Sequence, residues 1–335
     1  MLRKALLAAL LAAVALPAAA SPITWSPDGK QVAVAFKDGV AVAAVDGSSG
    51  WTLAGPGGKC PVWSPDGGSI VYSLPENGVA AAWVYDVKKG RTRKVAAEVG
   101  PPYAWREDGQ RFVGFSGSPE GTVEAVWYNL TDRGVTQRRA LPCRTVEEDP
   151  GDVVWLPETD DVAFVGRDGA QADVYIVESG DVTRVTRTGD IIGFALSMDR
   201  KELVWGRRGP NPKYILVTLY ALNLESRGSR RLPLPDRIPA LNPSPRQAPT
   251  GLGRAYPAAG LDALALIVAM APAPASSSAC WLGKLDGTGA IVRKWAGVPG
   301  GLAVVWSPDG RRVALFDGTV TLIGLDGSQV KLPAR

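Results

Sequence analysis

One short turn sequence that begins with tryptophan recurs along the chain, and it constrains the fold more than any other feature. Five copies of it begin at Trp25, Trp63, Trp105, Trp155 and Trp306. Three copies read Trp-Ser-Pro-Asp-Gly, and each copy is followed by a short apolar run such as residues 31–36. Self-similarity with a period of about 20 to 50 residues indicates a repeat architecture.

The residues of this turn suit a tight reversal between two strands. Proline fixes φ near the value required at the second position of the turn, and Asp-Gly tolerates left-handed backbone angles. The tryptophan therefore ends one strand, and the apolar run after it starts the next. Each copy continues through a second turn into further short strands, as at residues 84–86 and 92–95. Four short strands joined by Gly, Asp and Pro turns predict one propeller blade.

The spacing of the anchors predicts the number of blades. The first four tryptophans are separated by 38, 42 and 50 residues. Phe194 begins a weaker copy, and Tyr256 is the candidate anchor in the long gap before Trp306. The chain is thus predicted to be all-β, a seven-bladed β-propeller of four-stranded antiparallel blades, with six blades as the alternative if 252–298 is an irregular insertion. We expect the ring to close by packing blade 1 on blade 7 without exchanging a strand.

The first residues have the pattern of a secretory signal peptide. Two basic residues precede an apolar stretch over 5–16, and three alanines lead to Ser21. This order is typical of a cleavable export signal, and the apolar stretch is short for a membrane span. We expect a signal peptide over 1–20 and a single propeller domain over 21–335. The mature protein is then periplasmic or secreted, a monomer, and not an integral membrane protein.

The chain of 335 residues contains no histidine. A Ser-His-Asp triad, a Cys-His pair and a histidine metal site are therefore excluded. The sequence also lacks a Gly-x-Ser-x-Gly elbow, a phosphate-binding Gly-x-x-x-x-Gly-Lys loop and an EF-hand loop. These absences argue against most hydrolases and nucleotide-binding enzymes.

Carboxylates are the remaining candidates for chemistry. They gather in two clusters, Glu147-Glu148-Asp149 with Asp152, and Glu158-Thr159-Asp160-Asp161. Oxygen-rich turns without the ligand spacing of a known site are usually solvated. We expect no catalytic residue, metal or cofactor. The alternative is a carboxylate-dependent hydrolase or lyase that acts on a glycan or a lactone.

The cysteines and the repeated aromatic residues have structural interpretations. An oxidising compartment allows one disulfide among Cys60, Cys143 and Cys280, but three small buried thiols are favoured because the cysteines lie in different modules. Side chains that recur at the same point of every blade pack between sheets and do not form stacking platforms for a ligand. The predicted packing anchors are Trp25, Trp63, Trp105, Trp155, Phe194, Tyr256 and Trp306.

Charge is unevenly distributed along the chain. The formal net charge of +4 is too small for a general nucleic-acid binder. Residues 98–199 carry 19 acidic and 9 basic side chains, net −10, and residues 200–254 carry 3 acidic and 11 basic side chains, net +8. Arginine suits carboxylate and phosphate recognition, although solvated loop charges are the alternative. The candidate binding residues are Arg207, Arg208, Lys213, Arg237, Arg246 and Arg254.

With these residues in view, the chain resembles the WD-related propeller repeat of the TolB family. It is also similar to the propeller domains attached to prolyl oligopeptidase-type peptidases. The turns at Trp25, Trp63 and Trp306 carry the resemblance. An α/β domain ahead of the propeller is not expected, because the first repeat directly follows the signal, and the peptidases' histidine is missing. The resemblance implies a bacterial envelope protein that binds other proteins, and it supplies no catalytic residues.

These observations together predict a non-enzymatic, exported propeller that presents a rigid ring face to a protein or an anionic envelope ligand. Blade-connecting loops and the mouth of the channel would make the contacts. The basic residues of blades 5 and 6 would steer an anionic partner toward that face.

Overall fold

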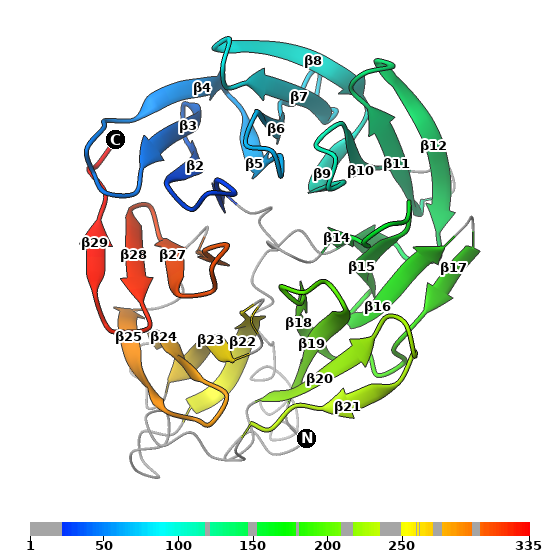
Figure 1. Ribbon diagram of the computed structural model, residues 1–335. Coiled ribbons are helices and arrows are strands. Elements are labelled where there is room, and N and C mark those ends of the chain that lie inside the picture. Colours follow the sequence, from blue (N-terminus) through cyan, green and yellow to red (C-terminus); the bar gives the residue numbers. More distant parts are fainter. Residues whose placement is uncertain are drawn as a thin grey trace, which may run out of the picture.

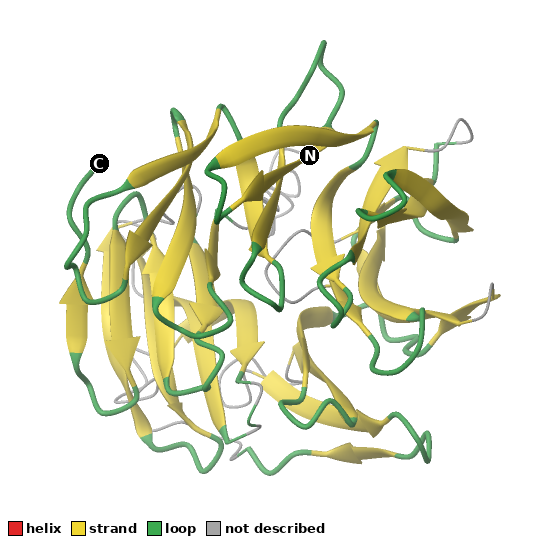
Figure 2. Cartoon of the chain, turned by 45° about the horizontal axis from the view of Figure 1, so that its top comes forward, coloured by secondary structure: helices red, strands yellow, loops and turns green. Residues whose placement is uncertain are grey.

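The computed structural model describes residues 22–117, 121–146, 153–178, 181–208, 217–234, 249–258, 260, 262–270, 277–296 and 302–335, with the backbone alone for 249–254, 268–270, 277 and 296. Within these residues, seven antiparallel sheets stand around a central axis (Figure 1). A tilted view shows strands and loops and no helix in this part of the chain (Figure 2). Accordingly, none of the described residues forms a helix that is long and apolar enough to cross a membrane. The chain is a seven-bladed β-propeller as predicted, and the six-bladed alternative is wrong.

Each sheet contains strands that are consecutive in the chain. Blades 1 and 2 comprise β1 (Ile23–Trp25), β2 (Gln31–Phe36), β3 (Gly39–Ala44), β4 (Thr52–Pro56), β5 (Lys59–Trp63), β6 (Ser69–Ser73), β7 (Ala81–Asp86) and β8 (Arg91–Ala97). Blades 3 and 4 comprise β9 (Gly100–Trp105), β10 (Arg111–Gly117), β11 (Val123–Asn129), β12 (Gly134–Leu141), β13 (Thr145–Val146), β14 (Val153–Trp155), β15 (Val162–Asp168), β16 (Gln171–Glu178) and β17 (Asp181–Arg184).

Blades 5 to 7 complete the ring. They comprise β18 (Ile191–Leu196), β19 (Glu202–Arg208), β20 (Val217–Asn223), β21 (Ser229–Arg231), β22 (Pro249–Pro257), β23 (Ala263–Met270), β24 (Ser277–Lys284), β25 (Gly289–Ala296), β26 (Ala303–Trp306), β27 (Arg312–Phe316), β28 (Val320–Gly324) and β29 (Gln329–Lys331). Blade 4 departs from four strands because β13 and β14 both pair with β15. We call the side that carries the turns after the innermost strands the turn face, and the opposite side the loop face.

The Ser-Pro-Asp-Gly turn satisfies its own polar groups, which explains why its sequence recurs. In blade 1, the Ser26 amide donates to the carbonyl of Gln31 at 2.9 Å, and the Gln31 amide donates to Ser26 Oγ at 2.9 Å. The Ser26 hydroxyl and the Lys30 amide both donate to Asp28 Oδ1, at 2.6 and 3.0 Å. Gly29 supplies the left-handed φ of 67°. Blades 2 and 7 repeat these bonds around Ser64 and Ser307.

The hydrophobic core lies between the blades. Seven clusters of buried apolar side chains each join two neighbouring sheets. Several tryptophans also donate their indole N–H to a carbonyl of the preceding blade: Trp25 to Val305 at 3.0 Å, Trp105 to Val62 at 3.1 Å, and Trp306 to Tyr256 at 2.8 Å. The tryptophans are therefore packing residues that join blades, as their recurrence predicted.

Two of the predicted anchors lie beside the repeat position. In the repeat, the backbone amide of the residue directly after the anchor donates to the carbonyl of the residue six positions after the anchor. In blades 5 and 6 the donating amides belong to Ser197 and Ala258. The structural equivalents of the tryptophan are therefore Leu196 and Pro257. Phe194 lies two residues earlier and Tyr256 one residue earlier; both are buried, in the cores between blades 4 and 5 and between blades 6 and 7. The predicted segments are right, but these two anchor positions are wrong because aromatic character was used to locate them.

The ring closes where blade 1 meets blade 7, and no blade mixes strands from the two ends of the chain. Figure 1 shows β2 and β3, in blue, beside β27 to β29, in red. Trp51 Nε1 donates to the carbonyl of Pro333 at 2.8 Å, and Arg312 Nη2 donates to the carbonyl of Gly29 at 3.3 Å. The expected closure by packing alone is confirmed.

One glycine fixes how closely blade 5 approaches blade 6. A Cβ atom added at Gly193 would lie 1.7 Å from the carbonyl oxygen of Ala255. We expect Gly193→Ala to lower the free energy of unfolding by about 1 to 3 kcal/mol, measured by urea denaturation, because the two blades must separate to admit the methyl group. Gly206→Ala is the matched control: Gly206 pairs with Gly193 across β18 and β19, and its nearest neighbours would lie 3.3 Å from the new Cβ. Equal losses in both variants would contradict this account.

Candidate functional site

The first residue of the predicted basic patch already has an acidic partner. Arg207 Nε and Nη2 lie 2.9 and 3.1 Å from the two carboxylate oxygens of Asp190, and the guanidinium also stands over the ring of Tyr220. The hydrogen bonds to Asp190 raise the pKa of Arg207 above its ordinary value. Arg207 is therefore half of a bidentate ion pair that ties β19 to the chain entering β18.

The structure describes little of the rest of that patch. Arg208 ends β19 with an exposed side chain on the loop face. Lys213, Arg237 and Arg246 lie outside the described residues, and only the backbone of Arg254 is described, within β22. Arg207 is thus partly buried and Arg208 is exposed, although they are consecutive in the chain. The patch as a whole stays a prediction.

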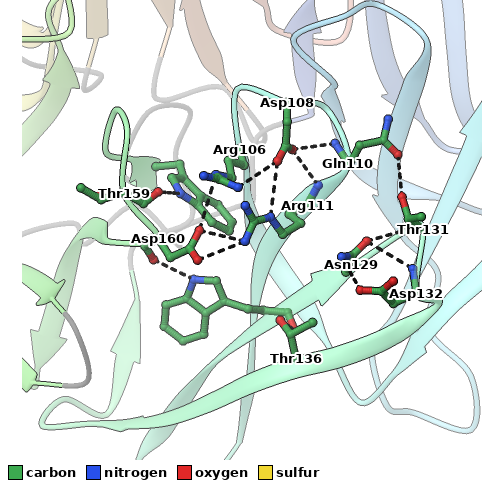
Figure 3. A network of polar contacts seen from close by, with 12 residues as sticks. Arg106, Asp108, Gln110, Arg111, Asn129, Thr131, Asp132, Thr136, Thr159 and Asp160 are labelled. Carbon is green, nitrogen blue, oxygen red and sulfur yellow. Dashed lines mark hydrogen bonds and ion pairs between the residues drawn. The ribbon is translucent and has the colours of Figure 1, made fainter.

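One carboxylate of the acidic cluster on the turn face, that of Asp160, pairs with arginines of blade 3. Asp160 contacts Arg106 Nε at 3.5 Å and Arg111 Nη1 at 3.0 Å, while Asp108 contacts the same two arginines (Figure 3). Among the described residues, no group of three or more Cys, Asp and Glu side chains could hold a metal ion. The other cluster, Glu147 to Asp149 with Asp152, lies outside the described residues.

A polar cavity of about 520 Å³ lies beside this network, between blades 3 and 4. Its lining includes Gln137, Arg139 and Asp161, and Trp127 closes one side by donating its indole N–H to the carbonyl of Asp160 at 3.2 Å. Trp127 is buried, so its ring is not a platform for a ligand. This cavity is best explained as the gap left where two twisted sheets diverge.

A mostly apolar hollow lies at the centre of the ring. It measures about 420 Å³ and is lined by the innermost strands of blades 1, 2, 3, 4, 5 and 7. The lining residues are Ile23, Thr24, Cys60, Pro61, Val62, Trp63, Pro65, Pro101, Pro102, Tyr103, Ala104, Trp105, Val153, Val154, Trp155, Leu196, Arg200 and Val305. A volume of this size suits a small ligand or the end of a peptide.

One charged side chain is found among these lining residues. Arg200 comes from the turn that joins β18 to β19, so it lies at the turn-face end of the cavity. Its Nη2 donates to the carbonyl of Trp155 at 3.2 Å, and its Nη1 lies 3.3 Å from Glu107 Oε1. An arginine within an apolar hollow makes this cavity the strongest candidate for a binding site in the described part of the chain.

This cavity was not predicted from the sequence. The lining residues are adjacent only after the ring has closed, and most of them are also strand-forming residues of the repeat. One local signal was available: the copy at 196–200 reads Leu-Ser-Met-Asp-Arg, so Arg200 stands where the complete copies have glycine. The left-handed backbone conformation of the turn favours glycine at this position and does not require arginine.

The three cysteines are buried and form no disulfide. Burial raises the pKa of Cys143 to about 11 and that of Cys280 to about 12. At pH 8, about one thiol in a thousand or fewer is then ionised at these two positions. We expect native protein to react with a small methanethiosulfonate reagent at Cys60 alone, because Cys60 lines the central cavity. Peptide mapping by mass spectrometry measures this, and Cys280 labelled as fast as Cys60 would contradict it.

No protein-family model matches this chain. No curated protein sequence matches it either. Among solved structures, the β-propeller domain of the Trilobed protease from Pyrococcus furiosus, which has an open velcro topology, is 15% identical with a TM-score of 0.54 over 91% of this chain and 92% of that chain. Oligogalacturonate lyase in complex with manganese is 13% identical with a TM-score of 0.59 over 92% of this chain and 88% of that chain.

TolB from Acinetobacter baumannii is 16% identical with a TM-score of 0.49 over 80% of this chain. The present chain spans 61% of that TolB chain. The structural matches with TM-scores above 0.5 show a common propeller fold, and function does not follow from fold. The propeller fold that the tryptophan turns predicted is therefore supported by the Trilobed protease domain and by oligogalacturonate lyase.

Proposed function

We propose that this chain is an exported, non-enzymatic β-propeller that binds a protein or an anionic envelope ligand at the centre of its ring. The observation that carries this proposal is the central cavity of about 420 Å³, whose lining is mostly apolar and includes one charged side chain, that of Arg200. Apolar cavities with few polar groups bind ligands by burying their surface and orienting them through those groups. The export signal predicted over residues 1–20 places the ligand outside the cytoplasm.

The proposal predicts that filling the cavity abolishes capture of the partner. The mature protein, residues 21–335, is immobilised and exposed to envelope extract of its own host at low salt, and bound material is identified by mass spectrometry. Val154→Trp fills the cavity, and Val135→Trp is the matched control because Val135 is 43% exposed on β12. Circular dichroism verifies that both variants fold.

A partner captured by wild type and Val135→Trp, lost by Val154→Trp, and able to slow the labelling of Cys60 supports the proposal. A partner captured equally by all three proteins places binding elsewhere on the ring. Retention of a glycan or a divalent ion without a protein partner overturns the proposal in favour of the carboxylate enzyme.

The basic patch enters the proposal as a steering surface. Reversal of Arg207 would place a carboxylate against Asp190, so a loss of binding would be confounded by a loss of stability. Charge reversal at Arg208 and Arg237 leaves the ion pair between Arg207 and Asp190 in place. We expect this double variant to bind the captured partner more slowly at low salt and equally at high salt, as measured by surface plasmon resonance, because steering is screened by ions. An unchanged association rate at low salt would remove the patch from the proposal.

A further inference from the structure

Arg200 occupies a backbone position at which four other blades have glycine. Its φ is 59°, and the equivalent glycines Gly29, Gly67, Gly109 and Gly310 have φ between 64° and 70°. A residue with a side chain is disfavoured in this left-handed conformation. Local turn chemistry therefore favours glycine at position 200, and departures of this kind concentrate where a protein binds or reacts.

The guanidinium of Arg200 has hydrogen-bonding capacity that the described protein does not use. Nη2 donates to the carbonyl of Trp155, and Nη1 contacts Glu107, but Nε is buried and has no hydrogen-bond partner. An unpaired buried donor is unfavourable. The side chain remains 29% exposed, so a solute can reach the guanidinium.

The present acidic partner of Arg200 is an exchangeable one. Glu107 belongs to the turn of blade 3, whereas Arg200 belongs to the turn of blade 5. Their contact therefore joins two blades that are not neighbours in the ring. The Glu107 side chain is 63% exposed and forms one contact of 3.3 Å. Exposed ion pairs of this kind contribute little stability.

The walls around Arg200 favour an apolar ligand. Pro65 and Leu196 lie in the lining near the turn face, and Pro101 and Pro102 lie in the lining at the start of β9. No acidic side chain is found among the described lining residues. A carboxylate that entered this hollow would meet an arginine fork in surroundings of low polarity, where charge-assisted hydrogen bonds are strong.

We propose that Arg200 binds the carboxylate of a ligand with an apolar body, which enters the central cavity from the turn face and displaces Glu107. A peptide C-terminus and a fatty acid both present this chemistry. The inference rests on the proposed function, and it specifies the group that the cavity recognises.

The test uses the mature protein and two pairs of probes. One pair is a random-sequence octapeptide pool with free C-termini and the same pool with amidated C-termini, and the other is octanoate and octanamide. Arg200→Gly removes the guanidinium and installs the residue that the backbone angle favours, so this variant is expected to fold. Arg133→Gly is the matched control, because Arg133 also has a positive φ, 54°, but lies in an exposed turn of blade 3 away from the cavity. Quenching of the lining tryptophans and isothermal titration calorimetry report binding.

We expect wild type and Arg133→Gly to bind one of the acids in preference to its amide, and Arg200→Gly to bind that acid about 10- to 100-fold more weakly. The probe pair that shows the preference identifies the ligand as a peptide end or a fatty acid. Equal binding of acid and amide, or full binding by Arg200→Gly, overturns the inference. Absence of binding by both acids to wild type also overturns it.

Glu107→Gln supplies an opposite readout. Removal of the competing carboxylate should tighten binding of the preferred acid by about 2- to 5-fold, an effect that a purely structural role of the ion pair would not produce. If Val154→Trp abolishes capture of a natural partner while Arg200→Gly leaves that capture and the probe binding unchanged, the proposed function stands and the carboxylate inference fails.

Discussion

Replacement of Trp25 by alanine is expected to lower the free energy of unfolding by about 3 to 5 kcal/mol, because a large buried side chain is lost where the ring closes. Trp25 is 5% exposed and packs in the core that joins blade 1 to blade 7. Its indole N–H donates to Val305, and Arg312 stands over its ring at 5.2 Å. No strand crosses this junction, so side-chain packing has to hold it. Equilibrium urea denaturation followed by far-ultraviolet circular dichroism measures the change.

The phenylalanine variants separate packing from hydrogen bonding. Trp63 holds the same position in blade 2, but its indole N–H is buried without a partner. Trp25→Phe removes the hydrogen bond to the Val305 carbonyl, whereas Trp63→Phe removes an unpaired donor. We expect Trp25→Phe to be the more destabilising variant by about 1 to 2 kcal/mol. A loss below about 1 kcal/mol for Trp25→Ala would show that this junction does not limit the stability of the ring.

The propeller was predictable because its determinants are local. The hydrogen bonds of the Ser-Pro-Asp-Gly turn all lie within six residues, so the turn can be recognised from the sequence without knowledge of the rest of the fold. In blades 5 and 6 the turn has no tryptophan, so the exact position of the turn could not be predicted. Leu196 and Pro257 are apolar like many of their neighbours, and the aromatic Phe194 and Tyr256 drew the prediction to adjacent positions. The number of blades survived these errors because spacing tolerates shifts of one or two residues.

The candidate site was not predictable for the opposite reason. The cavity is built from strands of six blades, and residues as distant as Thr24 and Val305 become neighbours only when the ring closes. Charge counts along the chain identified a basic segment, yet they could not show that Asp190 neutralises Arg207. A charge count adds the charges of a segment, whereas ligand binding depends on which charged side chains have no oppositely charged neighbour in the folded protein.

Arg200 belongs both to a local turn of the repeat and to the cavity that forms only when the ring closes. Its φ shows that the backbone keeps the turn conformation of the repeat even without glycine. A ring held by seven inter-blade cores can maintain an unfavourable backbone conformation, and the side chain at position 200 gives the lining of the central cavity its charge.

The second large effect is expected at a buried carboxylate in blade 4. Asp173 on β16 is 1% exposed and accepts hydrogen bonds from Thr186 Oγ1 at 2.6 Å and Arg184 Nη2 at 2.5 Å. The amides of Thr188 and Gly189 donate to the same carboxylate at 2.9 and 3.1 Å. These donors all lie in β17 or in the chain that leads from it into β18. Asp173 therefore fixes the connection between blades 4 and 5.

Asp173→Ala should lower the free energy of unfolding by about 3 to 5 kcal/mol, because it leaves Arg184 and several buried donors without their acceptor. Asp326→Ala is the control: Asp326 bonds to Ser328 in an exposed turn, and its loss should cost about 1 kcal/mol or less. Urea denaturation at pH 7 measures both. Similar losses in the two variants would mean that the buried network adds nothing beyond a surface turn.

The same carboxylate predicts how stability depends on pH. Burial by itself raises the pKa of Asp173, but the hydrogen bonds from Thr186, Arg184 and the two amides outweigh it, so the folded pKa lies below the ordinary value of 3.8. A depressed folded pKa means that the stabilisation is complete above the unfolded pKa and is lost as the pH falls through the folded pKa. The difference in unfolding free energy between wild type and Asp173→Ala should therefore be constant from about pH 6 to 8 and shrink below about pH 4. A difference that stays constant to pH 3 would show that the bonds to Asp173 do not depend on its charge.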